Sequence, residues 1–202
     1  MASMQYNKEK LNTLLLIEAS VAGNIENAKN LLKQGADVDA RNENGWTAMM
    51  LAAEYRHLDI VKYLVDHGAD VNATDNNGNT AMMLAARGGH LDTVKYFVDR
   101  GADPNLTNKF VETAMMLAAW AGHLDIVKYL VERGADPCLN NNKGKTAAML
   151  AIKNDHKDIA DYLNSVMQLM KNKEKMINSL GPGDSTPKLN NELLRILRTP
   201  KE

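Results

Sequence analysis

The sequence predicts an all-α solenoid of stacked helix–turn–helix units. A seven-residue segment rich in alanine and methionine occurs four times, and each copy opens on a threonine. These threonines, which lie 33 residues apart without slippage, are Thr47, Thr80, Thr113 and Thr146. A fixed period of about 20 to 50 residues is typical of units that stack in a row and contact only their neighbours. Such arrays usually present a surface to a partner, so the period also argues against catalysis.

Each unit contains two apolar segments with helical periodicity, separated by a short gap. In the second unit, one segment follows Thr47 and the other follows His57. Asp59 falls in the first turn of the second helix, where the helix dipole favours a carboxylate. Gly68 should end that helix, because glycine best tolerates the left-handed conformation there. The first helices are alanine-rich and can pack closely, which predicts a curved array with these helices and the loop tips on its concave side.

These residues closely resemble the ankyrin repeat over about residues 12–164. The resemblance implies helix–turn–helix units joined by projecting short β-hairpin loops, with binding on the hairpin tips and the first-helix face. The sequence departs from the family at the usual T-P-L-H-x-A opening, which here reads T-A-M-M-L-A-A. The helix-opening proline is absent, as is the histidine that supports hydrogen bonds between repeats.

Methionine replaces this polar opening. Seven of the twelve methionines lie in the repeated segment, at positions 49, 50, 82, 83, 115, 116 and 149. Methionine fills irregular gaps in apolar cores, so we interpret these residues as a core ladder. A methionine-rich binding groove is the alternative.

The resemblance predicts one domain of five repeats. The repeats lie near 12–41, 42–74, 75–107, 108–140 and 141–164, after an N-terminal extension at 1–11 and before a C-terminal region at 165–202. The first and fifth repeats depart most from the pattern, as expected for units that cap an open apolar face.

The C-terminal region should begin as an extension of the last helix. A Gly/Pro-rich linker follows at 181–187, and Thr186-Pro187 then predicts the start of a short amphipathic helix. Leu189, Leu193 and Leu197 share one side of this helix. It could cap the last repeat, dock in cis over the binding face, or recruit a second partner.

Composition fits a soluble, cytoplasmic, monomeric protein. Charged residues make up 24% of the chain and the net charge is −1, which argues against bulk electrostatic binding of nucleic acid. No segment approaches the roughly 20 apolar residues of a membrane-spanning helix. A single cysteine, Cys138, excludes an intrachain disulfide and fits a reducing compartment. Delivery as a secreted effector by a non-classical route is the alternative.

The sequence contains no catalytic, cofactor or metal motif that we recognise. Four histidines (57, 90, 123 and 156) recur at period 33 between the two helices of a unit. Stacking would separate them by about one helix diameter, roughly 10 Å, which is too far for shared ligation of a metal at bonds of about 2 Å. We therefore predict structural histidines, no cofactor and no metal site.

Candidate binding residues are those that break the internal repetition where the resemblance implies exposure. They are Trp46, Tyr55, Arg87, Phe110, Val111, Glu112 and Trp120. Val111 replaces the glycine of the other three loops, which predicts an altered turn. Exposed aromatic residues on a rigid surface are typical of binding hot spots. The alternative is that the two tryptophans cover the repeat below. Charge also grades along this face, from Glu43 and Glu54 to Lys143, Lys145 and Lys153.

The sequence therefore predicts a non-enzymatic module that binds another protein or peptide on its concave hairpin and first-helix face, as an adaptor or inhibitor. A bacterial effector or immunity-type protein that blocks a target enzyme is the alternative within this class. An enzyme whose activity lies in the tail is a remote alternative, because so short a region is too small for a catalytic domain.

Overall fold

The computed structural model describes the backbone of residues 2–179 and the side chains of residues 10–175. This part of the chain contains ten helices. They are α1 (Ala2–Ala22), α2 (Ile25–Lys33), α3 (Ala48–Glu54), α4 (Leu58–Asp66), α5 (Ala81–Gly88), α6 (Leu91–Asp99), α7 (Ala114–Ala121), α8 (Leu124–Glu132), α9 (Ala147–Lys153) and α10 (Lys157–Ser179).

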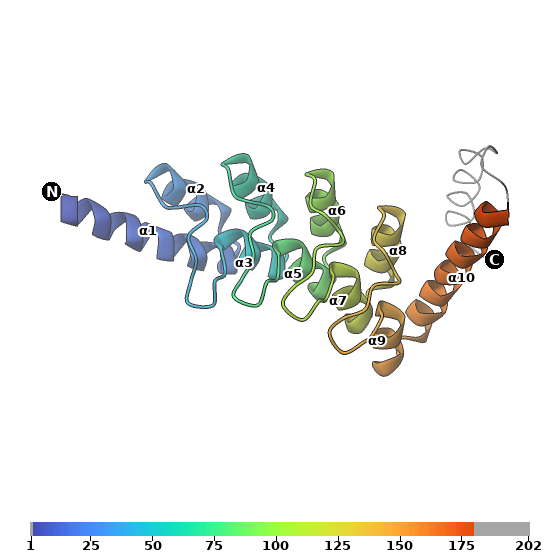
Figure 1. Cartoon of the computed structure of the whole chain (residues 1–202). Coiled ribbons are helices and arrows are strands. Elements are labelled where there is room, and N and C mark those ends of the chain that lie inside the picture. Colours follow the sequence, from blue (N-terminus) through green and yellow to red (C-terminus); the bar gives the residue numbers. More distant parts are fainter. Residues whose placement is uncertain (1, 180–202) are drawn as a thin grey trace.

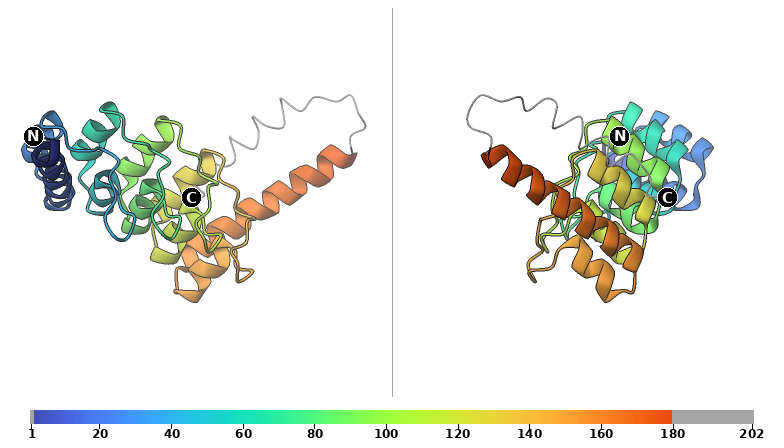
Figure 2. Two further views of the ribbon diagram at one scale, coloured as in Figure 1. Left: turned by 60° about the vertical axis from the view of Figure 1, so that its left-hand side comes forward. Right: turned by 90° about the vertical axis from the view of Figure 1, so that its right-hand side faces the viewer.

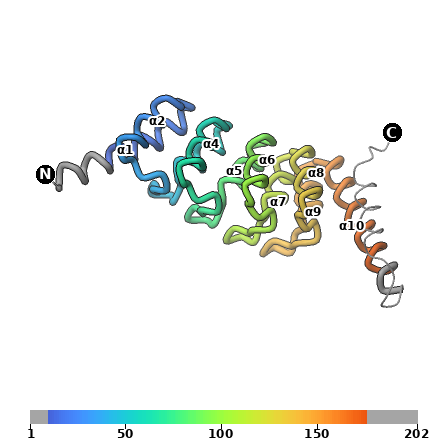
Figure 3. Tube along the Cα trace, turned by 90° about the horizontal axis from the view of Figure 1, so that it is seen from above, coloured from blue at the N-terminus to red at the C-terminus, as the bar shows by residue number. Residues whose placement is uncertain are grey.

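The helices form a stack of pairs, which confirms the predicted all-α solenoid (Figure 1). Each first helix packs against its own second helix, and α1, α3, α5 and α7 also pack against the first helix of the next unit. The second helices α2, α4, α6 and α8 form a separate row, and the units follow one another in order from α1 to α10 (Figure 3). The loops that precede α3, α5, α7 and α9 all project on the side of the stack away from the second helices (Figure 1).

Two helices extend beyond the repeat pattern. α1 begins at Ala2, so the residues predicted as an N-terminal extension continue directly into the first helix of repeat one. α10 runs to Ser179 and is longer than the other second helices. It projects away from the stack in both views of Figure 2. The linker and the amphipathic segment predicted after it lie outside the described residues.

The repeated threonine begins each first helix from α3 onward as its N-cap. Its hydroxyl oxygen accepts a hydrogen bond from the backbone N–H three residues later, at 3.3 Å in all four helices. Such a cap stabilises a helix by about 1 kcal/mol. It gives these short helices a defined start without the proline that the ankyrin pattern usually has there.

The recurring histidines connect neighbouring repeats. His57 Nε2 lies 3.1 Å from the carbonyl oxygen of Val21. His90 Nε2 lies 2.8 Å from the carbonyl oxygen of Glu54, and His123 Nε2 lies 3.0 Å from that of Arg87. A carbonyl oxygen can only accept, so each ring donates through Nε2. The prediction that these histidines are structural is confirmed for these three. They supply a polar link between neighbouring repeats.

The methionine ladder is core in the central repeats. The six methionines of repeats two to four are at most 2% exposed, which confirms that they pack rather than line a groove. Met149, in the last repeat, differs because 47% of its surface is exposed. Leu84 is fully buried, whereas Leu117, its equivalent one repeat later, is only partly buried against the core.

Tyrosines on the second helices form a second ladder between repeats. The ammonium groups of Lys62, Lys95 and Lys128 lie 5.7 to 5.9 Å from the centroids of tyrosine rings one repeat later. At Tyr96 the guanidinium of Arg100 also lies 4.8 Å from the ring centroid. Burial raises the pKa of the Tyr96 hydroxyl although Arg100 acts to lower it. These tyrosines therefore serve packing, as their period indicates.

Candidate protein-binding face

The projecting loops and the ends of the first helices together form one side of the stack, which we call the loop–helix face. It comprises the loop tips at 42–46, 75–79, 108–112 and 141–145, the last residues of α3, α5, α7 and α9, and Tyr55, the C-cap of α3. All seven candidate residues from the sequence lie on it. They come from three repeats, and their joint role in binding stays a prediction.

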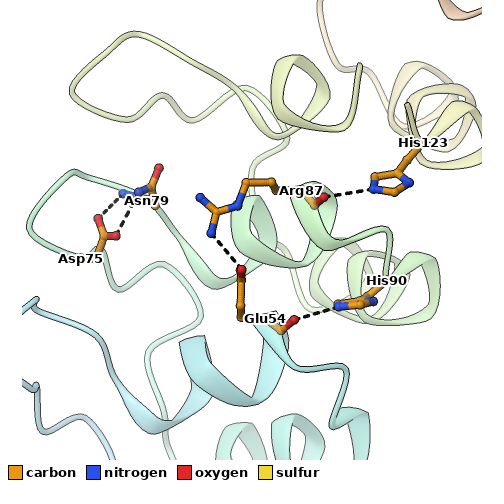
Figure 4. Close-up of polar contacts among 6 residues, drawn as sticks. All are labelled: Glu54, Asp75, Asn79, Arg87, His90 and His123. Atoms are coloured by element: carbon orange, nitrogen blue, oxygen red, sulfur yellow. Dashed lines mark hydrogen bonds and ion pairs between the residues drawn. The ribbon is translucent and has the colours of Figure 1, made fainter. Parts of the chain in front are cut away.

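Each loop tip is a tight turn opened by asparagine or aspartate. Asp75 Oδ1 accepts hydrogen bonds from the backbone N–H groups of Asn77 and Asn79, both at 2.8 Å. Asp75 Oδ2 accepts a further bond from the Asn79 side chain at 2.9 Å (Figure 4). The Asp75 N–H closes the turn by donating to the Asn79 carbonyl at 2.9 Å. The described loops contain one isolated bridge, Thr74 to Thr80, and no strand.

Neighbouring tips are linked to one another through the backbone. Asn76 N–H donates to the Asn44 carbonyl at 3.1 Å, and Lys109 N–H donates to the Asn77 carbonyl at 2.9 Å. The Asn142 N–H continues the series by donating to the Phe110 carbonyl at 3.0 Å. Three successive bonds of this kind hold the four tips in a row, so the face is preorganised for binding.

Val111 corrects one prediction from the sequence. Its φ of +60° is left-handed, like the +77°, +80° and +68° of Gly45, Gly78 and Gly144 in the other loops. The Val111 N–H also donates to the Asn108 carbonyl at 2.9 Å, just as the equivalent glycines donate to the corresponding carbonyls of the other loops. The turn is therefore retained rather than altered. A β-branched residue in this conformation is a genuine outlier, and an L-residue there costs roughly 1–2 kcal/mol.

Four of the candidate side chains are well exposed. The exposed fractions are 52% for Tyr55, 48% for Trp120, 47% for Phe110 and 42% for Val111. Trp46 differs, because it is only partly exposed and packs against the core. Trp120 thus offers more free ring surface than Trp46.

Arg87 is held by the preceding repeat. Its guanidinium lies 2.9 Å from Glu54 Oε1, and the two side chains are 38% and 23% exposed (Figure 4). The main chains of both residues are also engaged, since their carbonyl groups accept the bonds from His90 and His123. The pair positions the ends of α3 and α5. It also compensates Glu54, so the acidic end of the predicted charge gradient retains only Glu43 as an uncompensated carboxylate.

The basic end of the face is open to solvent. Lys143, Lys145 and Lys153 are all exposed and follow Trp120 in the next repeat. By contrast, the candidate residue Glu112, in the loop before α7, is partly buried and accepts a hydrogen bond from the Asn108 side chain at 3.2 Å. The departure of these lysines from the repeat pattern is the sequence signal that marks them. They belong to the loop–helix face, although they are not among the seven candidate residues.

Two features are absent from the described part of the chain, and its one cysteine has a shifted pKa. No group of three or more histidine, cysteine, aspartate or glutamate side chains is arranged there to hold a metal ion. No helix within residues 2–179 is both long and apolar enough to cross a membrane. Cys138 is an exposed residue, but partial desolvation of its thiol and the nearby Asp136 carboxylate raise the pKa of that thiol.

The fold and the loop–helix face define a repeat solenoid that offers a continuous, preorganised surface. A family model described as "Ankyrin repeats (3 copies)" matches residues 15–108 and 97–175. The chain therefore belongs to the ankyrin repeat family, whose members are generally protein-binding modules.

Individual relatives match shorter segments. Mitochondrial disaggregase from Bos taurus is 48% identical over 46 residues, which cover 23% of this chain and 7% of that protein. The human mitochondrial disaggregase is 42% identical over 57 residues, which cover 28% of this chain and 8% of that protein. An ankyrin repeat protein from Rickettsia felis is 42% identical over 62 residues, 30% of this chain and 97% of that protein. The chain thus aligns with less than a tenth of either disaggregase.

Proposed function

We propose that the loop–helix face binds a partner protein or an extended peptide, with Phe110, Val111 and Trp120 at the centre of the contact. The observation that carries this proposal is the backbone of Val111. Three loops use glycine at this turn position, whereas this loop keeps a strained, exposed valine beside an exposed phenylalanine. Strained residues are concentrated at functional sites, where the surrounding structure holds them. A strained apolar tip that adds little to the core has a clear use in recognition.

The surroundings of this tip suit a binding hot spot. Trp120 lies in the same repeat, on the end of α7, and is half exposed on a helix capped by Thr113. Hot spots are enriched in tryptophan and form where side chains are rigid and become fully desolvated. The backbone bonds between loop tips keep this part of the face in place, so binding orders little additional chain.

Charge adds a direction to the contact. The exposed Lys143, Lys145 and Lys153 lie one repeat beyond Trp120, whereas Arg87 on the other side is compensated by Glu54. We expect the partner to place an apolar side chain at the Phe110–Trp120 centre and carboxylates toward repeat five. Complementary charge of this kind orients a partner and speeds association. The module acts as an adaptor or inhibitor and performs no chemical step.

The test compares partner capture by the intact chain and by Trp120→Ala. Leu14→Ala is the matched control, because Leu14 is a similarly exposed apolar residue of α1, outside the face. A partner should be retained by the native chain and the control and lost with Trp120→Ala. Once it is identified, titration calorimetry should show at least about tenfold weaker binding, the 1.4 kcal/mol expected of a central hot-spot residue.

Stability measurements decide between binding and packing. Helix content and the melting temperature of Trp120→Ala should stay close to those of the native chain. If the variant unfolds and its folded fraction binds normally, Trp120 belongs to the core and the assignment is wrong. Unchanged affinity in a stable variant would equally move the contact away from Trp120.

A further inference from the structure

The outer side of α9 is the open end of the stack. In repeats two to four, the equivalent side of each first helix is covered by the next repeat. Met116 and Ala119 of α7 are accordingly 1% and 0% exposed, but their equivalents Met149 and Ile152 are 47% and 59% exposed. Position 152 also carries a larger apolar side chain than the alanine of the other repeats. The open end has therefore gained apolar surface at α9.

The second helix of the same repeat, α10, has become more polar at the equivalent outer positions. Two positions that are Leu124 and Val131 in α8 become Lys157 and Asn164 in α10, and both replacements are exposed. A terminal repeat needs a polar outer face when solvent covers it. α10 meets this requirement, whereas α9 does not. The pattern indicates a cover that lies over α9 and leaves α10 in water.

We propose that the C-terminal segment 188–198 of the same chain docks on the outer side of α9 through Leu189, Leu193 and Leu197. This inference does not depend on the partner proposed above. The segment lies outside the described residues, and its sequence predicts a helix that begins at Thr186-Pro187 with these leucines on one side. A helix of about 11 residues is marginal alone in water, so it needs an apolar surface such as that of Met149 and Ile152.

The intervening chain is long enough. α10 continues to Ser179, 14 residues beyond the end expected from α8, which at 1.5 Å per residue carries the chain about 21 Å past the last repeat. Residues 180–187 can span at most about 27 Å. The chain can therefore turn back and reach α9. A helix of 11 residues is about 16 Å long, enough to cover α9.

The charges agree with this placement. Lysine occupies the equivalent second-helix position in repeats two to four, but α10 carries Asp161 there. The segment 188–198 contains Lys188, Arg195 and Arg198 against a single acidic residue, Glu192. A basic helix beside Asp161 is favoured, whereas it would have been repelled by a lysine.

Cross-linking in the full-length chain tests the geometry. With Cys138→Ser removing the native thiol, Ile152→Cys and Leu193→Cys should form a disulfide within one chain under mild oxidation. The matched control pairs Asn72→Cys with Leu193→Cys, which should form little or none because Asn72 is an exposed residue of repeat two, several repeats away from α9. Non-reducing electrophoresis and peptide mass spectrometry distinguish the products. No bridge, or equal bridging in both pairs, would overturn the proposal, and bridges only between chains would assign the cover to a second copy.

Methionine oxidation provides a test that leaves α9 native. Exposed methionines react with peroxide faster than covered ones. Met149 should react severalfold more slowly than Met170, although Met149 is the more exposed of the two within the described residues. The double variant Leu193→Asp and Leu197→Asp should remove this protection, and Asn190→Asp with Asn191→Asp should preserve it. Equal rates in the native chain would contradict docking, whereas the proposal about the partner-binding face would stand.

Discussion

Val111→Gly should stabilise the fold and weaken partner binding at the same time. Val111 holds φ at +60° in a turn where the other three loops carry glycine. The left-handed conformation costs an L-residue roughly 1–2 kcal/mol. Glycine removes that cost but loses about 0.5–1 kcal/mol more backbone entropy on folding. Because 42% of Val111 is exposed, little packing is lost, and a net gain of about 0.5–1 kcal/mol remains.

A reciprocal substitution provides the control. Gly144 occupies the same turn position in the next loop with φ of +68°, and a Cβ atom there would meet no atom within 4 Å. Gly144→Val therefore adds strain without a clash and should destabilise the chain by a similar amount, about 0.5–1 kcal/mol. Gly45 would be a poorer choice, since a Cβ atom there would lie 2.5 Å from the Asn76 side chain.

Both variants can be followed by urea denaturation and thermal melting monitored by circular dichroism. A change of 1 kcal/mol corresponds to about 2–4 °C in a domain of this size. Opposite shifts of the midpoint are expected, with weaker partner binding for Val111→Gly because the apolar tip is lost. If Val111→Gly destabilises the chain, Val111 packs more than its exposure indicates and the strain argument fails. If stability rises and affinity is unchanged, strain at this turn does not mark the binding site.

Two further predictions follow from burial and from the electrostatic surroundings. Leu84→Ala should lower the free energy of unfolding by about 2–5 kcal/mol because Leu84 is fully buried. The equivalent Leu117→Ala should lower it clearly less, because Leu117 is only partly buried. Equal losses of unfolding free energy in urea would show that burial does not determine the effect. Because the pKa of Cys138 is raised, its alkylation by iodoacetamide should begin at a higher pH than the alkylation of an ordinary cysteine. Asp136→Asn should lower the pKa of Cys138 and so raise its alkylation rate at pH 8. An unchanged profile in Asp136→Asn would exclude the carboxylate as a cause.

Much of the architecture could be predicted from the sequence because the relevant signals are local and repeated. The threonine caps, the two apolar segments and the helix-ending glycines recur at one period, so each unit predicts the next. The methionine core followed from the same pattern, because a side chain at a fixed register in a stack meets the same neighbours each time. Candidate face residues also emerged, since only a position free of the common packing is free to vary.

Three features depended on the tertiary structure. The Val111 loop keeps its turn and accepts a strained φ, and hydrogen bonds link this loop to the neighbouring turns. The identity of residue 111 alone does not reveal these bonds. Arg87 could be placed on the face from its register, but its pairing with Glu54 requires two helices of different repeats to approach. The exposure of Met149, identical in sequence pattern to the buried Met116, depends on whether another repeat follows. Periodicity fixes what each unit presents, whereas burial depends on what packs against it, and only the assembled stack contains that information.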